Sequence, residues 1–236
     1  ERYGGLLADA PDTLFEDTMA RFRIRAMVVN IYLDQVFRDV VEGRNRSYPA
    51  MCRMAFPLPS FHNIHNPDSL GFLAGAMPER TLDAFLGAFR GFFDAARRAG
   101  IVCLKDQSAY FRSLAYRAWN RESADAAFAA AMTGPIPWEQ ATILSDFLFY
   151  EFLGMARDAG LPVQLHTGHL AGIRNEISKA NAVHLIPTLE AFPDTGFALM
   201  HGNWPYMDEY LFLGKNHPNA FLDLCWVQGI DPIYSI

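Results

Sequence analysis

Short apolar runs alternate along the chain with longer stretches in which apolar residues recur every three or four positions. The clearest longer stretch is 81–100, TLDAFLGAFRGFFDAARRAG, whose Leu, Phe and Ala residues form one stripe that ends at Gly100. This spacing predicts an amphipathic helix with one buried face. Further helices are predicted at 12–22, 34–43, 138–159, near 181–191 and near 206–215.

The short apolar runs predict six strands, near 25–33, 50–56, 101–105, 163–166, 197–201 and 220–224. The later runs are apolar throughout rather than alternating, which is typical of a parallel sheet covered on both faces. The segment 106–137 is a long excursion, predicted to be partly helical. The sequence contains no internal repeat, low-complexity segment or linker, so residues 1–236 are predicted to belong to a single α/β domain.

Three predicted strands end in a side chain that can bind a metal ion or a charged substrate. These residues are Lys105, His166 and His201, which lie far apart in the sequence. In a parallel α/β barrel the carboxyl ends of all strands open on one face, where active sites are assembled. We therefore expect the three side chains to converge at one rim of the sheet.

His166 and His201 are the best candidate pair for metal binding. Neutral imidazole is the commonest metal ligand in proteins, and zinc accepts nitrogen donors readily. Each histidine follows a buried strand and is soon followed by a glycine, Gly168 or Gly202, which allows a sharp turn or a close approach to a ligand. The alternative is that both are hydrogen-bonded structural histidines.

Lys105 ends the apolar run IVCLK, where a lysine is costly to bury unless it is paired or neutral. Three roles stay open from the residues alone. The lysine is a carbamylated bridge between metals, a cation for a substrate carboxylate, or one half of an ion pair.

Other polar and aromatic residues lie close to the two histidines in sequence. Arg174 and Asn175 supply directed donors suited to a carboxylate or a hydroxyl-rich substrate, and the alternative is an ion pair between Arg174 and Glu176. Trp204 either walls the pocket or packs the loop. Tyr206 is a further candidate substrate contact.

Asp223 lies inside the last predicted strand among apolar neighbours, so its carboxylate needs partners. It is either part of the site or paired with a lysine or arginine of the sheet. His169 is a candidate substrate contact. His62 and His65 follow the second strand, but the surrounding Asn and Pro residues favour a solvated loop.

Composition excludes several classes of protein. The net charge is −6 and no basic cluster occurs, so nucleic-acid binding is not expected. No apolar run reaches the roughly 18 residues that span a bilayer. The three cysteines are scattered, which predicts buried free thiols and a reducing, cytoplasmic location. The GxSxG, P-loop and GxGxxG patterns are all missing from the sequence.

The motifs QLHTG followed by RN, then LMHGNWPY and NAFLDLCW, resemble those of the amidohydrolase superfamily of metal-dependent (β/α)8 TIM barrels. The amidohydrolase-2 type is the most similar branch. The segment IVCLKDQSAYFRSLAY is similar to the strand-four segment of its nodulin-like and fluffy-type fusion proteins. The HxG…RN element also resembles uronate isomerases. The resemblance implies that the six strands are strands two to seven of eight. No HxH motif and no strand-eight aspartate occur in the chain, which begins at Glu1 without a methionine, so we expect a fragment of a longer enzyme.

The resemblance also implies a chemistry. His166 and His201 would bind a divalent metal, expected to be zinc, with Lys105 as a further metal ligand or as the group that holds a substrate carboxylate. Apart from the resemblance, Lys105 and Asp223 are the candidate catalytic residues. Activated water would then cleave an amide, ester or lactone bond in a small, carboxylate-bearing substrate. Metal-assisted decarboxylation, uronate-type isomerisation and a non-catalytic structural barrel are the alternatives. The oligomeric state stays open, a homo-oligomer included.

Overall fold

The computed structural model describes residues 11–31, 34–44, 51–65, 69–231 and 233. They contain a sheet of six parallel strands in sequential order. The strands are β1 (Met27–Asn30), β2 (Cys52–Pro57), β3 (Ile101–Asp106), β4 (Val163–His166), β5 (Phe197–Met200) and β6 (Ala220–Leu222). Each predicted strand is thereby confirmed to within a few residues.

Helices connect successive strands, as the alternation of the sequence predicted. The α-helices are α2 (Pro11–Arg21), α3 (Asp34–Val41), α4 (Pro59–His62), α5 (Leu82–Arg98), α6 (Arg121–Ala131), α7 (Trp138–Asp158), α8 (Ile186–Ala191), α9 (Met207–Asn216) and α10 (Val227–Ile230). Short 3₁₀ turns are η1 (Gly71–Ala76), η2 (Ser108–Tyr110), η3 (Ile177–Ala180), η4 (Ala182–Leu185) and η5 (His201–Asn203). None of the described helices is long and apolar enough to cross a membrane.

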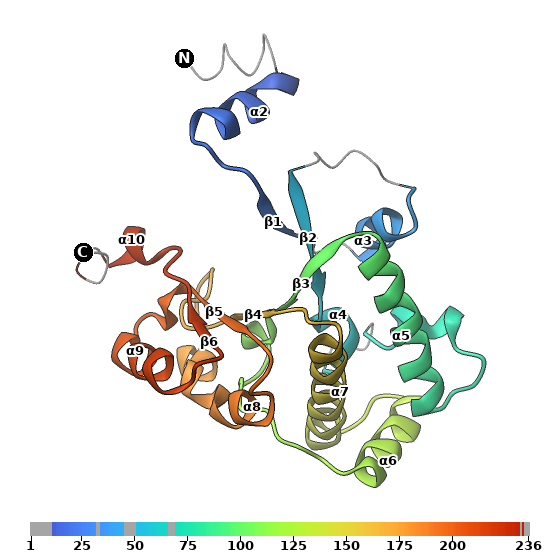
Figure 1. The fold of residues 1–236 in the computed structure, drawn as a ribbon. Coiled ribbons are helices and arrows are strands. Elements are labelled where there is room, and N and C mark those ends of the chain that lie inside the picture. The colour runs from blue at the N-terminus through green and yellow to red at the C-terminus, as the bar shows by residue number, and fades with distance from the viewer. Residues whose placement is uncertain (1–10, 32–33, 45–50, 66–68, 232, 234–236) are drawn as a thin grey trace.

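The sheet is open within the described part of the chain, where β1 pairs only with β2 and β6 only with β5. Helices α5, α6 and α7 lie to one side of it, and α8 and α9 lie beside β5 and β6 (Figure 1). Parallel strands in sequential order with helical crossovers are the arrangement of a (β/α)8 barrel. The fold is therefore part of such a barrel, as expected.

Stacked and edge-on phenylalanine rings are prominent in the core, beside leucine and alanine. Phe89 of α5 stacks on Phe152 of α7 with ring centroids 3.5 Å apart and meets Phe56 of β2 edge-on at 5.6 Å. Thr81 begins α5 by accepting a hydrogen bond from the amide of Ala84 on its side-chain oxygen. The predicted apolar stripe of this helix thus packs against α7 and the sheet.

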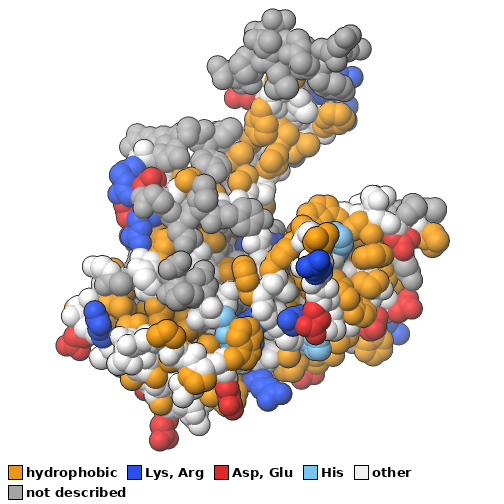
Figure 2. All heavy atoms as spheres, turned by 180° about the vertical axis from the view of Figure 1, so that it is seen from behind, with side chains coloured by type: hydrophobic (Ala, Val, Ile, Leu, Met, Phe, Trp, Pro, Cys, Tyr) orange, Lys and Arg blue, Asp and Glu red, His pale blue; other side chains and the backbone are white. Residues whose placement is uncertain are grey.

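Helix α2 and the turn that follows it project from the rest of the described structure (Figure 1, Figure 2). Large apolar side chains are exposed from this turn into β1, namely Phe22, Ile24, Met27 and Val28. Phe22 and Ile24 lie in the turn between α2 and β1, and Met27 and Val28 lie in β1 at one open edge of the sheet.

The prediction of a solvated loop for His62 and His65 is wrong. His62 ends α4 and is fully buried, with Nε2 3.4 Å from a carboxylate oxygen of Asp106. His65 is half-buried and stacks on Trp138 with ring centroids 3.6 Å apart, and burial lowers its pKa to about 4. The physical reason is that α4 turns the chain inward after β2, and Asp106 supplies the polar partner that a buried imidazole needs.

Candidate functional site

The carboxyl ends of β3, β4 and β5 meet at one cavity of about 360 Å³. Lys105, His166 and His201 all line it, so the expected convergence is confirmed. All three side chains are buried. The other lining residues are Asn30, Gln107, Tyr110, Met200 and Trp226.

The two histidines face each other through defined nitrogens. Nδ1 of His166 lies 3.2 Å from Nε2 of His201. Nε2 of His166 lies 2.7 Å from the backbone carbonyl oxygen of His169. A carbonyl oxygen only accepts hydrogen bonds, so Nε2 carries the proton and Nδ1 of neutral His166 presents its lone pair to His201.

Burial keeps both imidazoles neutral. It lowers the pKa of His166 to about 3, helped by the nearby His201, and the pKa of His201 to about 4, helped by Lys105. Burial also lowers the pKa of the Lys105 amine. Neutral imidazole is the form that binds metals, so the pair is ready to act as ligands near neutral pH.

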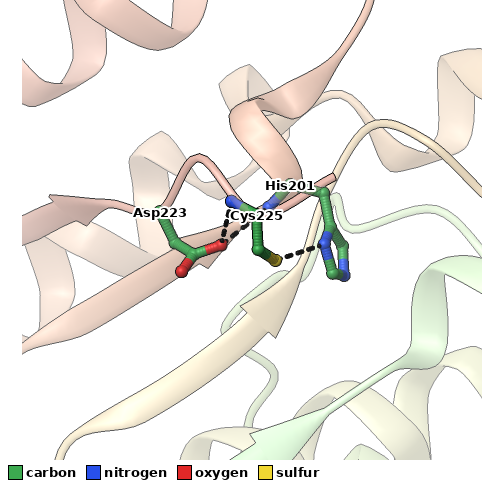
Figure 3. A group of neighbouring side chains, drawn as sticks. All are labelled: His201, Asp223 and Cys225. Atoms are coloured by element: carbon green, nitrogen blue, oxygen red, sulfur yellow. Dashed lines mark hydrogen bonds between the residues drawn. The ribbon is translucent and has the colours of Figure 1, made fainter. Parts of the chain in front are cut away.

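His201 lies in a strained turn. The backbone of His201, Gly202 and Asn203 is left-handed, with φ angles of 68°, 59° and 53°. Left-handed backbone is unfavourable for residues other than glycine, and such strain gathers at functional sites. One carboxylate oxygen of Asp223 accepts hydrogen bonds from the amides of His201 and Cys225, at 3.3 and 3.0 Å, and so holds the turn to the end of β6 (Figure 3).

Cys225 contacts His201 directly, with its Sγ 2.9 Å from Nδ1 of the imidazole (Figure 3). Ligand atoms of His201, Asp223 and Cys225 all lie within 4.8 Å of one another. Cys225 was predicted to be a buried free thiol, but it is partly exposed and contacts the site through His201. Its position two residues after Asp223, just beyond the predicted strand, was the signal that could have found it.

Distances decide which atoms fit a metal. Two nitrogens about 2.0–2.1 Å from one tetrahedral zinc lie about 3.3–3.4 Å apart, and a nitrogen and a sulfur ligand lie about 3.6 Å apart. The inner nitrogens of His166 and His201, at 3.2 Å, match the first value closely. Sγ of Cys225 and Nδ1 of His201 are only 2.9 Å apart, which is too close for a nitrogen and a sulfur that bind the same zinc. The donors of this chain therefore fit a divalent metal between the two imidazoles.

Aromatic rings surround the histidine pair. Trp226 stacks on His201 with centroids 4.1 Å apart and planes inclined by 14°, and its edge meets His169 at 5.5 Å. Trp204 meets His169 at 5.9 Å and places its indole nitrogen 3.4 Å from Asp231. Trp226 lines the cavity, although its role was not predicted from the sequence. Trp204 does not line the cavity and contacts His169 instead.

None of the five predicted substrate contacts lines this cavity, namely His169, Arg174, Asn175, Trp204 and Tyr206. Arg174 is exposed, and Asn175 donates to the carbonyl oxygens of its own loop at 3.0 and 3.3 Å. Tyr206 precedes α9 and accepts a hydrogen bond on its backbone from Asn203. Their role in substrate binding stays a prediction. The alternative ion pair between Arg174 and Glu176 is wrong, because Glu176 pairs with Lys179 at 2.9 Å.

Asp106, which the sequence analysis overlooked, organises a second buried cluster behind the sheet. Its carboxylate accepts hydrogen bonds from the hydroxyls of Tyr116 and Ser108, at 2.6 and 2.7 Å, and lies beside His62. Burial alone would raise the pKa of Asp106, but His62 and these hydrogen bonds hold it well below its usual value. The cluster supports the end of β3, next to Lys105.

The fold is part of a parallel α/β barrel, and the histidine pair at its carboxyl-terminal rim offers two nitrogens at a separation that fits a metal ion. The sequence matches the family model described as Amidohydrolase over residues 89–235, which is more than half of the chain. The protein therefore belongs to the amidohydrolase family, within the superfamily that the motifs resembled.

Individual relatives match this chain over only part of their own length. Protein fluG of Emericella nidulans is 34% identical over 86 residues, which are 34% of this chain and 10% of that protein. Uronate isomerase of Thermotoga maritima is similar in structure over 88% of this chain and 50% of its own, with 14% identity and a TM-score of 0.69. A metal-dependent hydrolase of Lactobacillus casei covers 77% of this chain and 46% of its own, with 21% identity and a TM-score of 0.61. This chain thus spans about half the length of those two structures, and their likeness concerns the fold.

Proposed function

We propose that the protein is a metal-dependent hydrolase in which His166 and His201 bind a divalent metal, with zinc as the ion. The observation that carries the proposal is the separation of 3.2 Å between Nδ1 of His166 and Nε2 of His201. Membership of the amidohydrolase family supports it. We also propose that residues 1–236 form part of one barrel domain.

The substrate is a small molecule, because the cavity of about 360 Å³ is near the lower end of ordinary ligand pockets. A bound divalent metal would polarise a carbonyl group and lower the pKa of water, which is the chemistry that hydrolysis of an amide, ester or lactone needs. Trp226 and Tyr110 line the same cavity and offer apolar surfaces to the substrate.

Lys105 brings an amine into the cavity. In its protonated form the amine pairs with a substrate carboxylate, which would favour acidic substrates. In its neutral form, which burial favours, the amine can combine with carbon dioxide, and the carbamate oxygens would add to the ligands of the metal. Mass spectrometry of the native protein distinguishes the carbamate from the free amine.

Metal analysis of the full-length protein tests the proposal. After purification without chelator we expect about one equivalent or more of a divalent transition metal, and less than about 0.2 equivalents would overturn it. His166→Ala and His201→Ala should each lower the bound metal at least about tenfold. His217→Ala, which removes a histidine outside the cavity, is the matched control and should retain the metal.

Activity assays then separate the possible reactions. A panel of small amides, esters and lactones, with and without a carboxylate, should include hydrolysed compounds whose turnover stops when the metal is removed and returns with zinc. Turnover confined to decarboxylation or to isomerisation of uronates would replace hydrolysis as the reaction. A metal-free protein without turnover would be a non-catalytic barrel.

A further inference from the structure

We infer that Cys225 is a positioning residue of this centre, which holds His201 through its outer nitrogen so that Nε2 presents its lone pair to the metal. The inference rests on the proposed metal site. It assigns to the thiol a role in orienting a ligand rather than in binding the metal itself.

The two histidines are held in the same manner from opposite sides. The outer nitrogen of His166, Nε2, donates a hydrogen bond of 2.7 Å to the carbonyl oxygen of His169. The outer nitrogen of His201, Nδ1, meets Sγ of Cys225 at 2.9 Å. A metal-binding histidine commonly donates its second ring N–H to a fixed acceptor, which sets both the tautomer and the ring orientation. For His201 that acceptor is Cys225.

The sulfur is poorly placed to be a ligand. A metal bound by Nε2 of His201 lies on the far side of the imidazole from Nδ1, the atom that Sγ contacts. Binding through Nδ1 instead would require the nitrogen and sulfur to separate from 2.9 Å to about 3.6 Å. It would also leave His166 facing the unused nitrogen.

The surroundings fix the thiol and the ring in this relation. The amide of Cys225 donates to the same carboxylate oxygen of Asp223 that accepts from the amide of His201, so both backbones are held together (Figure 3). Trp226 stacks on the imidazole and fixes its plane. A turn of 180° about the Cβ–Cγ bond of His201 would keep this plane but move Nδ1 away from Sγ, so the contact with Sγ opposes that turn.

A thiol can both donate and accept a hydrogen bond. Without metal it can donate to Nδ1 of His201, whose Nε2–H then donates to Nδ1 of His166. With metal it can accept from Nδ1–H, which leaves Nε2 free to bind. Serine keeps both capacities and alanine has neither, so the two substitutions separate the hydrogen bond from the volume of the side chain.

Titration of the full-length, metal-free protein with Co²⁺ tests the inference, because cobalt reports both its affinity and its ligands by absorption. Cys225→Ala should weaken Co²⁺ binding by about tenfold or more, and Cys225→Ser should bind within about threefold of the wild type. The near-ultraviolet absorption of the wild-type complex should lack a sulfur-to-cobalt charge-transfer band. Cys52→Ala, which removes a partly buried thiol at the start of β2, should change neither property.

Two results would overturn the inference while leaving the metal site intact. A charge-transfer band in the wild type that disappears in Cys225→Ser would make the thiol a direct ligand. Unchanged Co²⁺ affinity in Cys225→Ala would remove any positioning role, provided that the thermal unfolding of the metal-free variant matches the wild type. Failure of the wild type to bind Co²⁺ would instead overturn the proposed function, together with this inference.

Discussion

Lys105 and Asp106 are adjacent in β3, yet their side chains lie on opposite sides of the sheet. Lys105 lines the cavity with His166 and His201, whereas Asp106 accepts hydrogen bonds from Tyr116 in the cluster behind it. Successive residues of a strand point to opposite faces, so one dipeptide serves two environments. The two substitutions should therefore have different consequences, one for activity and the other for stability.

Replacing Lys105 should affect activity far more than folding. Lys105→Met keeps the length and removes a buried cation, so thermal stability should stay equal or rise, because burying a charge is unfavourable. Activity should fall at least about tenfold, since a buried charged group in a cavity is typical of a functional site. Lys179→Met, at an exposed ion pair, is the matched control. A Lys105→Met protein with a clearly lowered melting temperature and an unchanged specific activity would contradict this division.

Replacing Asp106 should mainly destabilise the protein. Asp106→Asn weakens charge-assisted hydrogen bonds and puts an amide next to buried donors, so we expect a loss of about 2–4 kcal/mol in the free energy of unfolding. Urea denaturation measures it. Asp158→Asn, at an exposed pair with Arg157, should change stability by less than about 0.5 kcal/mol.

The same carboxylate predicts a pH dependence. The pKa of Asp106 is lower in the folded protein than its unfolded value of about 3.9, so its contribution to stability is complete above that value and is lost as the pH falls toward the folded pKa. The wild type should therefore lose more stability than Asp106→Asn between pH 6 and about pH 3. Parallel curves for the two proteins over this range would show that the carboxylate is not ionised in the fold.

Gly168, two residues after His166, has no room for a side chain. A Cβ atom there would lie 2.2 Å from the backbone carbon of Asn203, and φ is 61°. Gly160 has nearly the same φ, 65°, but open space around it. Both Gly→Ala changes should cost about 1–2 kcal/mol for the left-handed backbone, and Gly168→Ala should cost at least about 1–3 kcal/mol more. Equal melting temperatures for the two variants would disprove the close packing of the loop at Gly168 against the backbone of Asn203.

Asp223 is predicted to act in catalysis as well as in holding the turn. Asp223→Asn keeps an oxygen that can accept from the amides of His201 and Cys225, so folding and metal content should be retained. An amide is not a base, so kcat should fall at least about tenfold, with a smaller change in KM. A variant with normal kcat would reduce Asp223 to its structural role.

Much of the fold was predictable because its signals are local. The stripe of α5 and the apolar runs of β3, β4 and β5 follow directly from residue spacing, and the convergence of Lys105 with the two histidines follows from parallel strands. The helix expected near 181–191 divides into η4 and α8. Pro187 lies at the start of α8, where its missing N–H is best tolerated.

The remaining site features depend on contacts between distant segments. His62 is buried because Asp106, 44 positions later, supplies its partner, and nothing around His62 in the sequence indicates this. Cys225 becomes significant only because the turn after β5 brings His201 against it. Asn175, by contrast, lies near the site in sequence, but its side chain is bonded to its own loop. Proximity along the chain was a weaker guide than position at a strand end.

Anomalous X-ray diffraction tests the central claim most directly. Crystals of the full-length protein grown with zinc or cobalt, measured on both sides of the absorption edge of the metal, locate the ion independently of any activity. The account predicts one strong anomalous peak within about 2.0–2.2 Å of both Nδ1 of His166 and Nε2 of His201. An anomalous map of a metal-loaded crystal with no peak between these two nitrogens would contradict it.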